Sequence, residues 1–235
     1  MTEIAQRTMT EQVLAQVRDL ILSGALEPGS KINQNELAQR FATSLVPVRE
    51  ALARLQSSGL VRIVPHRGAF VAGLSVEEMV DIYAMREVLE EQAAQEAAGR
   101  FTDADIVAIE ALVQQIEITS STEAFDTFLR LNRDLHFTIY RAAGRPHLLH
   151  VIEQLWNQSE RYRRLQIHSI PQRVEASLSE NQLILAACHQ RDAESLGSIV
   201  RYKVHQTKVG LLEIMRSSDA QHDPASDHGA AALAE

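Results

Sequence analysis

The sequence predicts a mostly α-helical protein with a short mixed region at its N-terminus and an all-helical region after it. Apolar residues recur at helical spacing through most of the 235 residues. Two segments with the composition of β-strands, 60–64 and 69–72, flank a short basic turn and interrupt this pattern. We therefore expect one domain at 1–74, a helical domain at 75–216, and a disordered tail from 217 to 235, which is rich in Ser, Asp, His and Ala.

The first part is predicted to hold three helices. Thr10 is the expected cap of the first helix, which ends at Ser23 before a glycine. Asn33 is the expected cap of a short second helix, and a third helix begins near Val46 after a tight turn and ends at Ser58. With the two β segments that follow, this order predicts a winged helix-turn-helix.

The second part is predicted to be a bundle of about six helices. Residues Ser75 to Glu78 have the pattern of a capping box, with a serine followed three residues later by a glutamate, and the first helix of the bundle follows. Later helices are expected at about 103–118, 122–143, 147–167, 173–190 and 193–216, from the same helical periodicity.

Composition and charge exclude several classes of protein. No apolar run approaches the roughly 18 residues that a membrane span needs, and the N-terminus lacks the features of a signal peptide. The single cysteine, Cys188, fits a reducing cytoplasm. The net charge is −8, but residues 1–74 carry eight Lys and Arg against six Asp and Glu, so the acidic excess belongs to the rest of the chain. This distribution is compatible with DNA binding at the N-terminal end.

Polar side chains on the third helix and at the turn between the β segments are suited to contact DNA. Arg49 lies one turn into the helix, and Gly68 lets the backbone approach the duplex because it has no side chain. Alternatively, Arg49 pairs with Glu50 or Glu36 on a solvated face. The candidate DNA contacts are Ser44, Arg49, Arg54, His66, Arg67 and Gly68.

These segments resemble the DNA-binding domain of the GntR family over nearly all of residues 8–74. The resemblance is carried by Asn35-Glu36-Leu37-Ala38, by the run from Pro47 to Leu55, by Gly59-Leu60-Val61 and by the run from His66 to Val71. It implies binding of operator DNA as a homodimer, through the third helix and the wing. The family often has an Arg-Thr pair before its Pro-Val-Arg segment, whereas this chain has Leu45-Val46.

Five polar residues fall on otherwise apolar stripes of four helices in the second part. Burying such groups without partners costs roughly one to several kcal/mol, so they indicate either a satisfied internal network or a ligand cavity. We favour the cavity for the set. The candidate effector contacts are Arg86, Asn132, His136, Asn181 and Lys203.

The second part resembles the FCD effector domain of the FadR-type branch of GntR regulators, through Arg86 to Glu90, Asn132 to His136 and Ser179 to Asn181; Leu155-Trp156 is similar to its VanR-like subgroup. Many such domains bind a divalent metal through an Asp or Asn and three His. Here Asn132, His136, Asn181 and Lys203 take those places.

This set of residues lacks the donors that a divalent metal needs. An amide is a weak ligand and an ammonium repels the ion, so we expect no cofactor and no metal, with His136 the one weak candidate ligand. Lys203 and Arg86 would instead bind a small acidic effector directly.

The resulting hypothesis is a cytoplasmic, dimeric regulator that binds operator DNA and a small acidic molecule, without a membrane partner. One alternative is an enzyme in which His136 is a general base or a metal ligand, but the sequence supplies no nucleophile, paired acid or cofactor loop. Another is a winged helix that binds protein, which would not need the basic tip at His66 and Arg67.

Overall fold

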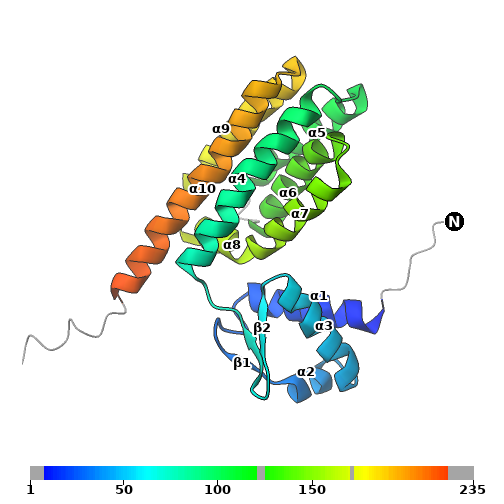
Figure 1. Ribbon diagram of the computed structural model, residues 1–235, viewed down its shortest axis with the longest axis vertical. Coiled ribbons are helices and arrows are strands. Elements are labelled where there is room, and N and C mark those ends of the chain that lie inside the picture. Colours follow the sequence, from blue (N-terminus) through cyan, green and yellow to red (C-terminus); the bar gives the residue numbers. More distant parts are fainter. Residues whose placement is uncertain (1–7, 121–124, 170–171, 222–235) are drawn as a thin grey trace, which may run out of the picture. The chain divides into compact units, whose positions relative to one another are not determined.

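The computed structural model describes residues 8–120, 125–169 and 172–221. The described chain divides into two compact units: the first holds the residues up to Ile82 together with His150–Arg164, and the second holds the rest. Most of these residues are helical, and the N-terminal helices are accompanied by a small sheet (Figure 1), so the predicted fold class is confirmed. Within the described ranges, no helix combines the length and apolarity that a membrane span requires.

The N-terminal part of the first unit is a winged helix-turn-helix. Its sheet has the order β1-β3-β2, with both pairs antiparallel, so the last strand lies in the middle. The two-residue strand β1 was not predicted, because so short a segment carries no periodic pattern. The elements are α1 (Met9–Leu22), β1 (Lys31–Ile32), α2 (Gln34–Arg40), α3 (Leu45–Ser57), β2 (Val61–Val64) and β3 (Gly68–Val71).

The start of α1 differs from the sequence-based prediction. Thr8, and not Thr10, is the cap: its hydroxyl accepts from the Glu11 amide, and the Glu11 carboxylate accepts from the Thr8 amide. Thr10 lies inside the helix, where its hydroxyl donates to Glu50 at 2.7 Å. The predicted cap at Asn33 is confirmed, since its side chain accepts from the amides at the start of α2.

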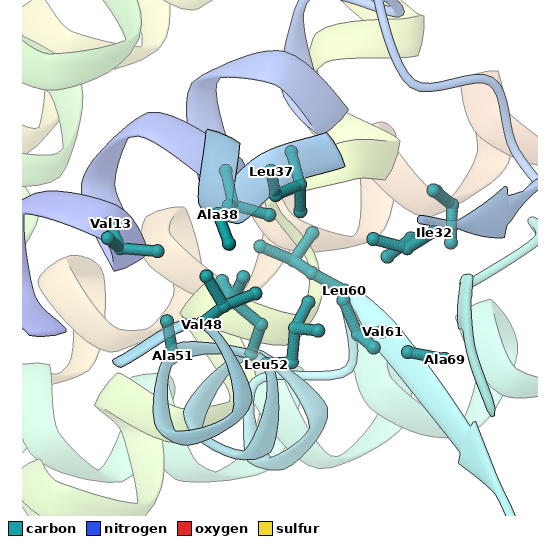
Figure 2. Packing of buried hydrophobic residues seen from close by; sticks show 13 residues of the cluster. Val13, Ile32, Leu37, Ala38, Val48, Ala51, Leu52, Leu60, Val61 and Ala69 are labelled. Atoms are coloured by element: carbon teal, nitrogen blue, oxygen red, sulfur yellow. The ribbon is translucent and has the colours of Figure 1, made fainter. Parts of the chain in front are cut away.

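One apolar core holds the winged helix together (Figure 2). Val48 and Leu52 of α3 pack with Val13 of α1, Leu37 of α2 and residues of the sheet. Burying a side chain of this size stabilises the fold by about 1.5–3 kcal/mol. Because one face of α3 packs against this core, its opposite face is exposed to solvent.

Seven helices follow in the described residues. The segment 147–167, predicted as one helix, is two, because the chain leaves helical geometry at Ser159, whose hydroxyl donates to the Trp156 carbonyl at 3.0 Å. The helices are α4 (Val76–Ala98), α5 (Asp103–Ser120), α6 (Phe125–Ala142), α7 (Pro146–Gln158), α8 (Glu160–Ser169), α9 (Gln172–Gln190) and α10 (Ala193–Gln221).

The predicted capping box at the start of α4 is half formed. The Ser75 hydroxyl accepts from the Glu78 amide at 3.1 Å, as predicted. The Glu78 carboxylate, however, accepts from Tyr162, and the same Tyr162 hydroxyl accepts from the Ser75 amide at 3.3 Å. A buried tyrosine of α8 therefore replaces the second arm of the box.

The second unit is a helical bundle. Helix α5 packs on α6 and α9, and α9 packs on α10. Figure 1 shows the long helices α4, α9 and α10 running beside one another. Helix α10 continues past Arg216, the expected end, to Gln221; the remainder of the expected tail, 222–235, lies outside the described residues.

Candidate functional site

The outer face of α3 carries the polar residues that were predicted to contact DNA. Ser44, Arg49 and Arg54 are exposed, whereas Val48 and Leu52 point into the core. Ser44 occupies the cap position, but its hydroxyl makes no capping hydrogen bond. The face therefore offers a hydroxyl at the first turn and two guanidinium groups further along, which are the groups that bind phosphates and base edges.

Among the described residues, Arg49 is held by α2 and not by a carboxylate. Its Nε donates to Gln34 Oε1 at 3.4 Å. Glu50, one of the two partners considered from the sequence, accepts from Thr10 of α1 instead. The charge of Arg49 thus stays on the exposed face, next to the N-terminal end of α2.

The wing tip is a tight turn between β2 and β3. His66 has a φ of 61° and Gly68 a φ of 103°, and the Arg67 amide donates to the Val64 carbonyl at 3.1 Å. Left-handed geometry at two positions turns the chain sharply, so the exposed His66 and Arg67 side chains stand at the tip.

One basic residue near the wing was not found from the sequence. A Cβ placed on Gly68 would lie 3.4 Å from Cε of Lys31, so this exposed lysine of β1 adjoins the wing turn. In the sequence, Lys31 is a single lysine in a short segment between two turns. Its position beside the wing became evident only from the pairing of β1 with β3.

Two of the five predicted effector residues lie in one buried chain of hydrogen bonds in the second unit. Arg86 Nε donates to Glu90 Oε1 at 2.6 Å, and the Tyr140 hydroxyl donates to Glu90 Oε2 at 2.6 Å. His136 Nδ1 lies 2.8 Å from the same hydroxyl. Because the Tyr140 proton is given to Glu90, the hydroxyl oxygen accepts from His136, which places a proton on Nδ1.

The charges in this chain are balanced. Burial opposes a charge on Arg86, but the Glu90 carboxylate beside it raises the pKa of the guanidinium. Burial and the neighbouring Glu90 also raise the pKa of Tyr140 well above its usual range, so the hydroxyl keeps its proton and remains a donor. Arg86 and Glu90 therefore form a neutral pair.

The other three predicted residues form a second buried network. Lys203 Nζ donates to Asn181 Oδ1 at 2.5 Å and to Ser177 Oγ at 2.8 Å. Asn181 Nδ2 donates in turn to Asn132 Oδ1 at 3.1 Å. Helices α10, α9 and α6 are thus joined through polar groups, which is the satisfied internal network that the sequence left open beside the favoured cavity.

A carboxylate and a guanidinium that were not predicted complete this network. Glu180 accepts from Arg173 at 2.9 and 2.7 Å and lies 3.5 Å from Lys203 Nζ. Among the described residues, two cations therefore share one carboxylate. Burial lowers the pKa of Lys203 to about 7, with Glu180 opposing this effect and Arg173 adding to it.

The two networks meet on α6. Asn132 belongs to one and His136 to the other, and residues four apart on a helix are neighbours on one face. The unpredicted members are Glu90, Tyr140, Arg173, Ser177 and Glu180. The spacing of four between Arg86 and Glu90 and between His136 and Tyr140 was the available signal for two of them.

The residues present do not fit a divalent metal. The Asn181 and Asn132 carbonyl oxygens already accept hydrogen bonds, and Lys203 presents an ammonium donor where a ligand lone pair is needed. Of the five predicted effector residues, only His136 has a side-chain nitrogen of the kind that binds a metal. In the described ranges, three or more His, Cys, Asp or Glu residues nowhere come together as a metal-binding group.

Comparisons with known proteins agree for both parts of the chain. Residues 9–71 match the model of the bacterial regulatory proteins of the gntR family, and residues 81–205 match that of the FCD domain. The transcriptional regulator McbR of Escherichia coli K12 is 27% identical over 206 residues, which are 87% of this chain and 93% of McbR. The repressor GlaR of the same organism is 29% identical over 189 residues, 77% of this chain and 86% of its own.

Solved structures show the same architecture. The structure of E. coli McbR/YncC has a TM-score of 0.77 at 25% identity and covers 89% of this chain and all of its own (100%). A GntR regulator from Rhodococcus sp. RHA1 has a TM-score of 0.71 at 19% identity, covering 87% of this chain and 97% of its own. The latter supports the fold alone. The relatives are named as transcriptional regulators and not as enzymes.

Proposed function

The chain belongs to the gntR family of bacterial regulatory proteins and is a DNA-binding transcriptional regulator with an FCD effector domain, and from this we propose that it binds operator DNA as a homodimer controlled by a small acidic metabolite. In this proposal residues 1–74 bind DNA, and residues 75–216 bind the effector and form the dimer. Its place of action is the cytoplasm, where its operator lies. The observation that carries the effector half is the pair of cations, the half-buried Arg173 and the buried Lys203, that share Glu180.

For DNA binding, we assign α3 to the major groove and the wing tip to an adjacent minor groove. The exposure of Arg49 and Arg54 on α3 supports the first assignment, and that of His66 and Arg67 supports the second. Ser44 binds a phosphate or a base from the first turn, and Gly68 lets the wing approach the duplex.

For dimerisation, the argument is geometric. One winged helix reaches too few base pairs to select an operator in a genome, whereas a two-fold protein reads a two-fold site with both heads. A homodimer therefore matches the proposed operator binding.

For the effector, the charge of the second network decides its chemistry. Glu180 is held by both Nη atoms of Arg173, so it offsets that guanidinium, and Lys203 is left with the weaker contact at 3.5 Å. A carboxylate from a ligand would balance the charge of Lys203 and accept a charge-assisted hydrogen bond from its ammonium. A neutral ligand would not balance the charge of Lys203 and would not accept a charge-assisted hydrogen bond through a carboxylate.

Arg86 has a different role from the one expected. Glu90 neutralises its guanidinium, so we assign the carboxylate of the effector to Lys203, and we assign Arg86 as a second donor of the proposed effector site. We assign His136, which is hydrogen-bonded to Tyr140, to the same effector site.

The experiment joins both halves of the proposal. Double-stranded DNA is selected from a random library with the purified full chain, and the selected duplex is then titrated with acetate, propionate, benzoate and succinate, each paired with its amide. We expect at least one acid to raise the melting temperature and change the affinity for the duplex, and its amide to do neither. The response should be lost in Lys203→Met and kept in Lys208→Met, a lysine of α10 that pairs with Glu87.

Two results would contradict the proposal. Failure to select any duplex would remove operator binding. An acid that acts equally on wild type and Lys203→Met would remove the proposed pocket while leaving DNA binding intact.

A further inference from the structure

The first turn of α3 has two apolar residues with opposite environments. Leu45 is partly buried against the core of the winged helix. Val46, the next residue, has 61% of its surface exposed. An exposed branched apolar side chain at this point contributes nothing to the core, although it stands at the end of the helix that faces DNA in the proposed complex.

The neighbours of Val46 on the exposed face indicate its surroundings in a complex. Arg49 and Ala53, three and seven residues further on, share its side of the helix and are exposed. Val46 therefore precedes a cation on the same stripe, without a hydrogen-bonding group of its own. A side chain of this kind cannot recognise guanine, whose major-groove edge presents only acceptors.

We infer that Val46 is a specificity residue that contacts the C5-methyl group of a thymine in the major groove. Thymine is the one base with an apolar group on that edge, and apolar side chains recognise it by excluding water. Leu45 and Val46 occupy the positions where the family often has an Arg-Thr pair. Because Leu45 packs against the core, Val46 is the residue of this pair that is left to contact DNA. The operator should therefore carry an A·T pair in each half-site where similar regulators bind with polar groups.

This inference rests on the proposed docking of α3, and its test separates the two. The duplex selected by the full chain is synthesised with each thymine replaced in turn by deoxyuridine, which removes only the methyl group. Burial of one methyl group predicts binding about fourfold weaker at one thymine of each half-site and unchanged binding at the others.

Two variants complete the experiment. Val46→Ser should bind the thymine and deoxyuridine duplexes equally, because it has no apolar surface to place against the methyl group. Val107→Ser, a substitution of an equally exposed valine of α5 at 62%, should retain the discrimination of the wild type. Equal affinity of the wild type for every deoxyuridine duplex, or discrimination that persists in Val46→Ser, would overturn the inference. Loss of all binding in Arg49→Ala at the same time would still uphold the docking of α3.

Discussion

The Tyr140 hydroxyl donates to Glu90 Oε2 at 2.6 Å and thereby joins α6 to α4 inside the effector domain. The other oxygen of the same carboxylate accepts from Arg86, and the hydroxyl accepts from His136. One phenol thus links a buried ion pair to the imidazole and sets which nitrogen of the imidazole carries the proton.

Replacing Tyr140 by Phe should destabilise the protein and change the tautomer of His136. Loss of the hydroxyl leaves a buried carboxylate oxygen and an imidazole N–H without their partner, which costs about 1–3 kcal/mol. Urea unfolding measures the first effect and ¹⁵N chemical shifts of the imidazole measure the second. Tyr202→Phe, an exposed tyrosine of α10, is the control and should change neither. An unaltered imidazole spectrum in Tyr140→Phe would show that the phenol does not set the tautomer.

Lys203 should make the stability of the empty protein depend on pH. Its pKa falls from 10.5 to about 7 on folding, so between these values the unfolded chain holds a proton that the folded chain has released. The unfavourable contribution of the buried charge is therefore complete below pH 7 and declines as the pH rises. Lys203→Met removes it, so the stability of the variant relative to wild type should fall by about 2 kcal/mol from pH 6.5 to pH 9. Urea unfolding at both pH values measures this difference, and a constant difference would contradict the prediction.

Arg49→Ala and Arg67→Ala should each weaken binding to the selected duplex without unfolding the protein. Both residues are exposed, so their removal leaves the core intact, and a good base contact is worth about 1–3 kcal/mol. Fluorescence anisotropy at physiological salt measures the affinity, and Arg130→Ala, whose side chain is 62% exposed on α6, is the control. Unchanged affinity in both variants would refute the assignment of α3 and the wing.

The protein should be a dimer at micromolar concentration. A two-fold operator requires two heads, and the affinity of one winged helix alone is too low for selective binding. Multi-angle light scattering of the full chain, alone and with the selected duplex, gives the mass directly. A mass of one chain, 26.2 kDa, in both samples would refute the dimer.

Protein purified without chelator should contain no stoichiometric zinc, manganese or nickel. The position where a third histidine would bind the ion holds Lys203, and an ammonium must lose its proton before it can coordinate. Elemental analysis tests this, and the melting temperature should be the same with and without EDTA. One metal ion per chain that is lost in His136→Ala would overturn the prediction.

The sequence predicted well those features that depend on periodicity. The apolar spacing placed α1, α2 and α3, and the polar interruptions of apolar stripes identified Asn132, His136, Asn181 and Lys203 as buried. The residue pattern alone was enough for these, because helix faces follow from a spacing of 3.6 residues.

Features that depend on tertiary contacts were missed. Threonine is a common cap residue, so Thr10 was predicted to cap the helix. However, α1 begins two residues earlier, because Thr8 and Glu11 form reciprocal capping hydrogen bonds. The sequence did not predict that Glu90 neutralises Arg86, or that Glu180 pairs with Arg173 seven residues earlier. The residues around these charged groups carry no pattern that identifies their partners. The position of Lys31 beside the wing could not be predicted without knowing that β1 pairs with β3.

The lysine at position 203 has a consequence for how the regulator would operate in a living cell. A metal-dependent receptor can lose its ion when the supply falls, whereas the lysine side chain is part of every copy from synthesis onward. In the proposed scheme the threshold for response is then set by metabolite concentration and by internal acidity. Because the pKa of Lys203 is about 7, acidification charges more of the receptors and lowers the amount of acid needed to fill them.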